Sequence, residues 1–291
     1  MNVVITPTMI GQVVISGVLA GALYAMVALG LALIFGVMRI INIAHGPLFM
    51  LGAYATYFLY TAGVNPYLTL PLSMAALFLL GVLLQRTLIF RVVDAPELSS
   101  LLLTFGISIA LVNLAQLTFT SDLRAVEYLT GAYLIGPFAF SKSRIVAFLF
   151  AAGITAAAFL FLQRTRLGKA IRATSQSREV AMVCGIDVGR IHLITFGLAS
   201  ALAAAGGTLI AVIVAIQPEM GQIWTFKSFL VIVLGGAGNY PGALLGGLLL
   251  GLVEQLASLF LTTQLSEAVA YVLLVLVLLV RPTGLLGGRQ T

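Results

Sequence analysis

Polar residues and helix breakers interrupt this chain where long apolar stretches lie on both sides. The stretch "INIAHGPLFMLG", residues 41–52, places Asn42 and His45 directly before Gly46 and Pro47. Polar side chains and broken backbone at membrane depth can contact a solute or relay a proton. For His45 the plainer interpretation is a local hydrogen bond at a helix start, and we favour it over a relay or a substrate contact.

A second interruption of the same kind lies near the C-terminal end. The stretch "LGGAGNYPGALLGG", residues 234–247, places glycines, an asparagine and a proline between two apolar runs. Paired interruptions in the two halves of a transporter indicate a site near the membrane midplane between inverted repeats. We therefore predict an inverted repeat and a translocation path beside both breaks. The predicted path residues at the breaks are Asn42, His45, Gly46, Pro47, Gly235, Gly236, Gly238 and Asn239.

One carboxylate, Glu254, lies inside the apolar run "LLLGLVEQLASLF". Carboxylates within a membrane are costly and are functional candidates by default. We add Glu254 to the predicted path, and a bond from it to a neighbouring helix is the structural alternative. Glu219 and Lys227 flank the stretch "QPEMGQIWTFKSF", and we interpret them as interface or vestibule residues on the outer side.

The composition places these residues in a membrane protein. The chain has 291 residues, of which 61% are hydrophobic and 8% charged, whereas soluble domains carry about 25% charged residues. We predict an all-α polytopic integral membrane protein. The net charge of +6 is explained by loop residues that orient the protein. Because no basic stripe with interleaved aromatics is present, no nucleic-acid partner is expected.

Apolar segments set the predicted architecture, because a membrane-spanning helix needs about 20 residues. Charges and breakers bound nine candidates, at 9–37, 46–62, 67–85, 98–120, 145–162, 190–216, 224–236, 242–262 and 266–280. The segments 46–62 and 224–236 are short and adjoin the breaks, so each is predicted to be re-entrant or a half-helix. The sequence therefore predicts eight or nine transmembrane segments in a single domain, residues 1–291.

Basic residues concentrate in the loop at residues 163–190. The positive-inside rule puts this loop in the cytoplasm, the N-terminus outside and the C-terminus inside. Four basic residues then fall on the outer side, namely Arg124, Lys142, Arg144 and Lys227.

The same loop predicts one amphipathic helix from about residue 167 to residue 184. Gly185 suits its C-terminal cap, and Asp187 suits the N-cap of the next span. Small residues recur at three- and four-residue spacing, at Ala170, Ala173, Thr174, Ser177 and Ala181. We expect this face, flanked by arginines, to dock closely into a groove of another protein. A solvated loop helix, or one lying on lipid headgroups, is the alternative.

No enzyme motif is present in the sequence. The stretch "LGKAIRAT" contains Gly168 and Lys169 but lacks the rest of a phosphate-binding loop. The single cysteine, Cys184, excludes an internal disulfide and a paired-cysteine metal motif. His45 and His192 lack the spacing of metal ligands. We predict a non-enzyme with no cofactor and no metal site.

Three stretches resemble the permease subunits of branched-chain amino-acid ABC transporters, in particular the shorter of the two paralogous permeases of such systems. They are "GALYAMVALGLALIFGVMRIINIAHGPLFMLGAY", "RTRLGKAIRATSQSREVAMVCGIDVGRI" and "FLVIVLGGAGNYPGALLGGLLLGLVE". The resemblance implies a permease of an importer for branched-chain or other hydrophobic amino acids in a bacterial inner membrane. It also implies a second paralogous permease, two cytoplasmic ATP-binding subunits and an external solute-binding protein as partners.

The resemblance gives the loop at 163–190 the role of a coupling helix, on which the ATPases push. The residues assigned to coupling are Arg166, Gly168, Ala170, Arg172, Ala173, Arg178, Glu179, Ala181 and Gly185. Two alternatives stay open. The same machinery could carry urea, short amides or another small solute, or the chain could be a self-contained transporter with Glu254 or His45 as a proton relay.

Overall fold

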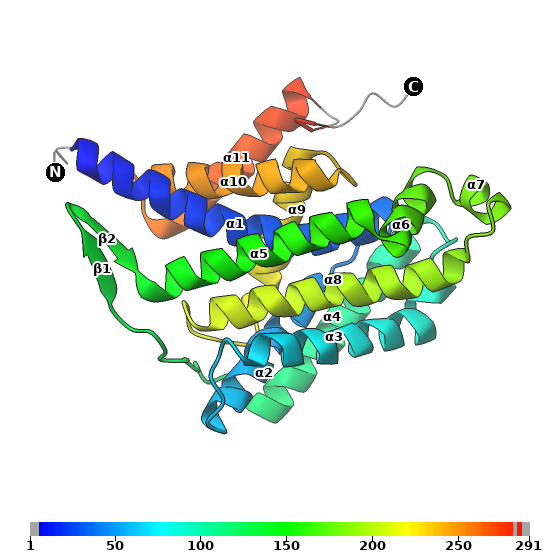
Figure 1. The fold of residues 1–291 in the computed structure, drawn as a ribbon, viewed down its shortest axis with the longest axis horizontal. Coiled ribbons are helices and arrows are strands. Elements are labelled where there is room, and N and C mark those ends of the chain that lie inside the picture. The colour runs from blue at the N-terminus through cyan, green and yellow to red at the C-terminus, as the bar shows by residue number, and fades with distance from the viewer. Residues whose placement is uncertain (1–5, 282–283, 287–291) are drawn as a thin grey trace.

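Helices form most of the chain in the computed structural model, which describes residues 6–281 and 284–286 (Figure 1). Nine of them match the nine apolar segments to within a few residues. They are α1 (Pro7–Met38), α2 (His45–Thr61), α3 (Thr69–Thr87), α4 (Glu97–Phe119), α5 (Lys142–Arg164), α8 (Val188–Ala211), α9 (Met220–Gly235), α10 (Tyr240–Ala257) and α11 (Thr263–Val280). The prediction of an all-α, multi-pass membrane protein is confirmed.

Two helices form the centre of the bundle. In α1 and α8, 78% and 83% of the spanning window is buried, against 22% in α4 and α5. Six helices of the described chain, α1, α3, α4, α5, α8 and α10, are long and apolar enough to cross a membrane. The shorter helices include α2 and α9, the two segments predicted as half-helices. Helices such as α4 and α5 are apolar but little covered by the rest of the chain. Such helices are suited to contact with lipid or with another subunit.

Glycines let α1 and α10 approach closely in antiparallel directions. A methyl group on Gly17 or Gly21 would press on the backbone of Leu252 or Leu248, and one on Gly251 would meet the backbone of Gly21. Small residues are the usual means of helix association where lipid supplies no hydrophobic drive. These contacts fix α10 against α1, and they position Glu254 on α10 beside Tyr24 on α1.

A small β-hairpin, which the sequence analysis does not predict, lies beside the start of α1. Strands β1 (Ala132–Ile135) and β2 (Phe138–Ser141) pair antiparallel around a turn whose first residue, Gly136, has φ 59°. Glycine is favoured there because two-residue hairpin turns need positive φ. The Gln12 side chain donates to the Ala139 carbonyl at 2.7 Å and accepts from its N–H at 3.1 Å. We call this end of the bundle the hairpin end.

The opposite end carries α6 (Arg166–Gln176) and α7 (Arg178–Val183), with a short 3₁₀ turn, η1 (Ile89–Arg91), before α4 (Figure 1). The prediction of one helix over 167–184 is wrong. Ser177 is extended, at φ −155° and ψ 121°, and its side chain accepts a bond from the Val180 N–H. Serine competes for backbone bonds in this way and favours helix starts over helix interiors.

The predicted C-terminal cap at Gly185 and the predicted N-cap at Asp187 are both confirmed. Gly185 has φ 80°, and its N–H donates to the Met182 carbonyl while the Ile186 N–H donates to the Ala181 carbonyl. This pair of bonds is a Schellman cap. Asp187 caps α8 by accepting from the Arg190 N–H at 3.0 Å.

We expect Gly185→Ala to cost about 1–2 kcal/mol, because an L-residue is strained in the left-handed region. An added Cβ would meet no neighbouring atom, so the cost comes from the backbone alone. The measurement is the Tm of the purified protein in detergent. Gly106→Ala is the control, because its Cβ would also meet nothing and it lies inside α4, where alanine is favoured over glycine. An unchanged Tm for Gly185→Ala would contradict the cap.

Candidate functional site

The first break lies deep inside the bundle. After α1 ends at Met38, Arg39 takes a left-handed conformation at φ 56°, and residues 40–44 are irregular until α2 begins at His45. The His45 Nε2 lies 3.0 Å from the Val27 carbonyl oxygen. Val27 precedes the end of α1 by about three turns, roughly 16 Å. The short helix α2 therefore starts well within the length of α1.

Both polar side chains of this break are fully buried, at 0% exposed for Asn42 and for His45. His45 bonds to α1 rather than locally at its own helix start, which corrects the plainer sequence interpretation. Neither polar side-chain atom of Asn42 has a hydrogen-bond partner among the described residues, and His45 Nδ1 has none there either. In this conformation the two residues lie inside protein and do not face open space.

Threonines of other helices satisfy the irregular backbone of the break. The Thr104 hydroxyl of α4 donates to the Ile41 carbonyl at 2.9 Å and accepts from the Ile43 N–H at 3.2 Å. The Thr225 hydroxyl of α9 lies 3.4 Å from the Ile43 carbonyl oxygen. Such partners allow non-helical backbone at membrane depth. Sequence reasoning missed both threonines, since nothing local distinguishes them from other threonines in apolar helices.

The second break lies near the far end of α1. Gly236 and Gly238 have positive φ, at 99° and 76°, and Gly238 packs against Gly36. Asn239 caps α10 by accepting from the Gly242 N–H at 3.1 Å. Both breaks thus adjoin the end of α1, and the first one continues inward until His45 reaches the level of Val27.

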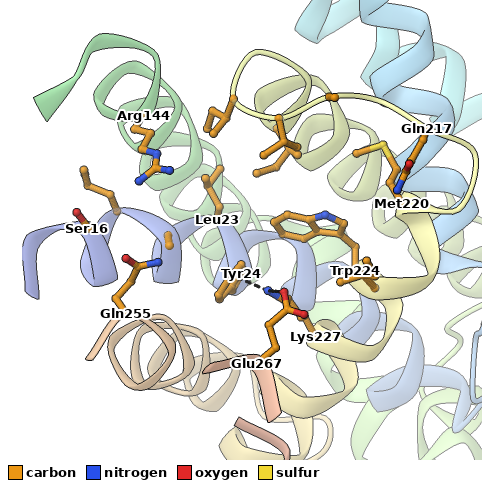
Figure 2. A pocket seen from close by; sticks show the side chains of 17 residues that line it. Ser16, Leu23, Tyr24, Arg144, Gln217, Met220, Trp224, Lys227, Gln255 and Glu267 are labelled. Atoms are coloured by element: carbon orange, nitrogen blue, oxygen red, sulfur yellow. Dashed lines mark hydrogen bonds and ion pairs between the residues drawn. The ribbon is translucent and has the colours of Figure 1, made fainter. Parts of the chain in front are cut away.

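Glu254 belongs to a buried ion-pair cluster that joins four helices. Lys227 Nζ of α9 lies 3.0 Å from Glu254 Oε1 of α10 and 3.1 Å from Glu267 Oε1 of α11. The Tyr24 hydroxyl of α1 donates to Glu254 Oε2 at 2.6 Å. Lys227 donates to that hydroxyl at 3.2 Å (Figure 2). Of the two interpretations of Lys227, the interface residue is wrong, because Lys227 is only 8% exposed, whereas the vestibule residue agrees with the cavity that Lys227 lines. Its place within the apolar run "TFKSFLVIVLG" is the signal that could have revealed this.

Part of the small-residue face of the 163–190 loop turns inward. Gly168 packs on the backbone of Leu162, and Thr174 and Ala181 are 2% exposed. Ala170, Ala173 and Ser177 of the same face are half-buried, so contacts within the chain use only part of it. Val183 is 89% exposed on the opposite side.

A family of permease components of branched-chain amino acid transport systems matches residues 13–278. The chain belongs to this family. Two curated relatives are similar over 95% of this chain and 95% of their own length. The high-affinity branched-chain amino acid transport system permease protein LivH of Salmonella typhimurium is 33% identical, and BraD of Pseudomonas aeruginosa is 34% identical. The probable permease LivM of Methanocaldococcus jannaschii is 29% identical over 44% of this chain. No solved structure gives a significant match.

In this permease the predicted path residues fall into three separate places. Asn42, His45, Gly46 and Pro47 lie where α2 crosses α9, Gly235 to Asn239 lie near the end of α1, and Glu254 lies with Lys227. Arg166, Arg172 and Glu179 are exposed at the α6–α7 end. Within the described residues, no group of His, Cys, Asp or Glu side chains could hold a metal ion.

Proposed function

We propose that this permease is the transmembrane subunit of an ATP-binding-cassette importer for branched-chain or other hydrophobic amino acids. It works in a bacterial inner membrane with its N-terminus outside and its C-terminus in the cytoplasm. Family membership and the names of LivH and BraD support the cargo. The similarity to LivM supports a second, paralogous permease as its partner.

The observation that carries the ATP-driven mechanism is the α6–α7 end of the bundle. There α6 and α7 protrude and leave large apolar side chains exposed. We define the coupling surface as Leu167, Val180, Met182 and Val183 with the flanking residues Arg166, Arg172 and Glu179. Exposed apolar residues rimmed by charge are typical of protein contacts. Two cytoplasmic ATPases bind this surface and its counterpart on the second permease. The small residues of the loop allow α6 and α7 to pack and end as they do; these are Gly168, Ala170, Ala173, Ala181 and Gly185.

The first break is the moving part of the translocation path in this proposal. A buried amide without partners costs about 1–3 kcal/mol per unsatisfied group. Asn42 has no such partner among the described residues, so a second conformation that supplies one would recover this cost. An external binding protein delivers the solute at the hairpin end.

Purification of the tagged chain from its native membrane tests this function. We expect a second permease and ATPase subunits to co-purify. Val183→Glu should lose the ATPases and ATP-driven uptake, because a carboxylate then lies in the apolar contact. Leu134→Glu is the control for recovery of the ATPases, since Leu134 is 79% exposed on the hairpin at the other end.

Two results would contradict the proposal. Recovery of the chain alone, with uptake driven by a proton gradient, would favour the self-contained transporter. Full ATPase recovery with Val183→Glu would show that the coupling surface lies elsewhere.

A further inference from the structure

A cavity of about 520 Å³ lies at the end of the bundle that carries α6 and α7. The last turn of α3, the segment that follows it, α7 and the first turns of α8 form its wall. Figure 1 shows α3 running alongside α8 to this end. The cavity volume is within the range of about 300–1,000 Å³ that small-molecule sites occupy. Neither the translocation path nor the ion-pair cluster uses this cavity, so it is open to another ligand.

Two buried polar side chains in the cavity wall lack hydrogen-bond partners. Gln85 of α3 is 2% exposed, and His192 of α8 is 7% exposed. Neither Gln85 Oε1 nor His192 Nε2 has a partner among the described residues. A buried polar group without a partner is destabilising, and protein, water or a ligand usually supplies one. A ligand with hydroxyl groups can do so at both side chains, because a hydroxyl both donates and accepts.

The rim of the cavity carries one uncompensated positive charge. Arg86 is exposed near the end of α3 and takes part in no ion pair within residues 6–281 and 284–286. The wall contains two other charged residues, Arg178 and Asp94, and they pair with each other at 3.1 Å. One guanidinium is thus left to bind an anion. Its geometry suits a phosphate, which it can hold through two parallel hydrogen bonds.

An apolar track on α3 leads away from the rim. Leu79, Leu83 and Arg86 follow one another at four- and three-residue spacing, so they lie on one face of the helix. The two leucines are 68% and 55% exposed, and only 28% of the spanning window of this segment is buried within the chain. In a membrane this face contacts hydrocarbon, and an arginine at the helix end lies at the level of the headgroups. The arrangement favours the phosphate of a phospholipid over a free phosphate ion.

We propose that this cavity binds the headgroup of an anionic phospholipid whose phosphodiester carries a hydroxylated group, as in phosphatidylglycerol. Arg86 binds the phosphate at the rim, Gln85 and His192 bind the glycerol hydroxyls deeper in the wall, and the acyl chains lie along Leu79 and Leu83. The phosphate and the glycerol follow one another along one short chain, so a single headgroup reaches both places. Basic pockets between spanning helices are known to bind anionic lipids. The inference goes beyond the proposed function, since lipid binding needs neither cargo nor ATPases.

Native mass spectrometry of the full-length permease in detergent tests the site. We expect phosphatidylglycerol to bind about tenfold more tightly than phosphatidylcholine with the same acyl chains, because phosphatidylcholine is zwitterionic and lacks hydroxyl groups. Phosphatidylmethanol keeps the anionic phosphate but lacks the glycerol hydroxyls, so its affinity should lie between the two. Glycerophosphoglycerol, the same headgroup without acyl chains, should bind at least about tenfold more weakly than phosphatidylglycerol, because it cannot use the apolar track.

Two variants assign the parts of the headgroup. Arg86→Gln should weaken the binding of phosphatidylglycerol and of phosphatidylmethanol alike, by about tenfold. Gln85→Met keeps the length of the side chain and removes its amide. It should lower the affinity for phosphatidylglycerol toward that for phosphatidylmethanol and leave the binding of phosphatidylmethanol unchanged. Arg190→Gln is the control, because Arg190 is exposed in the first turn of α8 and lies outside the cavity wall.

Thermal stability separates lipid binding from folding. Without added lipid, Gln85→Met should have a Tm at least as high as the native protein, since a buried amide without a partner is removed. Phosphatidylglycerol should raise the Tm of the native protein and of Arg190→Gln, and raise that of Arg86→Gln much less.

Three results would contradict the proposal. Equal binding of phosphatidylglycerol and phosphatidylcholine, or an unchanged affinity for phosphatidylglycerol in Arg86→Gln, would overturn the site. Glycerophosphoglycerol binding as tightly as phosphatidylglycerol would show that the cavity takes a soluble phosphate ester, and the lipid assignment would then be wrong.

Discussion

Replacing Lys227 with methionine is expected to lower the free energy of unfolding by about 3–5 kcal/mol, the cost of breaking a buried ion pair by removing one partner. Glu254 is 6% exposed, and without Lys227 its charge keeps only the Tyr24 hydroxyl. The shape of the lysine stem is largely preserved, so lost packing contributes little. Unfolding of the purified variant in detergent, followed by circular dichroism, measures the loss.

A second substitution distinguishes charge from packing. In the double variant Lys227→Met/Glu254→Gln the only carboxylate of the cluster that keeps its charge is Glu267, whose side chain is 38% exposed. No deeply buried charge is then left unpaired, so at least half of the lost stability should return. Lys169→Met serves as the control, since this lysine is exposed on α6 and such changes are usually within about 0.5 kcal/mol. If the double variant is less stable than Lys227→Met alone, the buried charge is not the cause.

Gly46→Ala is expected to destabilise the protein by about 3 kcal/mol, the upper end of the usual cost of overpacking, because the contact is rigid on both sides. The added methyl would overlap the Gly221 carbonyl oxygen and the Thr225 hydroxyl. Both belong to the first turns of α9, and Gly46 lies in the first turn of α2, so backbone would have to move against backbone. The yield of monodisperse protein and its Tm report the effect.

Gly153→Ala provides the matched control for this crossing. Gly153 also lies within a helix, α5, but an added Cβ there would meet no atom within 4 Å. We expect no loss of stability in that variant. A Gly46→Ala protein as stable as Gly153→Ala would show that α2 and α9 do not cross this closely.

The sequence predicts the helices of this fold well because their boundaries are local. Arg39 and the Gly46–Pro47 pair end one helix and start another whatever the rest of the chain does. Gly185 and Asp187 are likewise predicted correctly, since a helix end needs only neighbours within a few residues.

Contacts between helices were not predictable in the same way. Helices that are apolar on all sides carry no periodic signal to show which face points inward. Lys227 therefore looked like an outer residue, although the packing of α10 against α9 and α1 brings Glu254 to it. The burial of Ala181 is not predictable for a related reason, because small residues suit an internal contact as well as an external one.

Arg178 determines where force on the coupling surface would be delivered. Its guanidinium binds Asp94, in the connection before α4, at 3.1 Å and also the carbonyl of Met38, the last residue of α1. Met38 directly precedes the irregular segment that leads to Asn42. If α7 tilts, Arg178 would pull on the Met38 carbonyl and so on the polar break that follows it. No membrane-spanning helix has to bend first. In the proposed mechanism, a displacement of α7 at the coupling surface would therefore reach the first break through Arg178 and the end of α1.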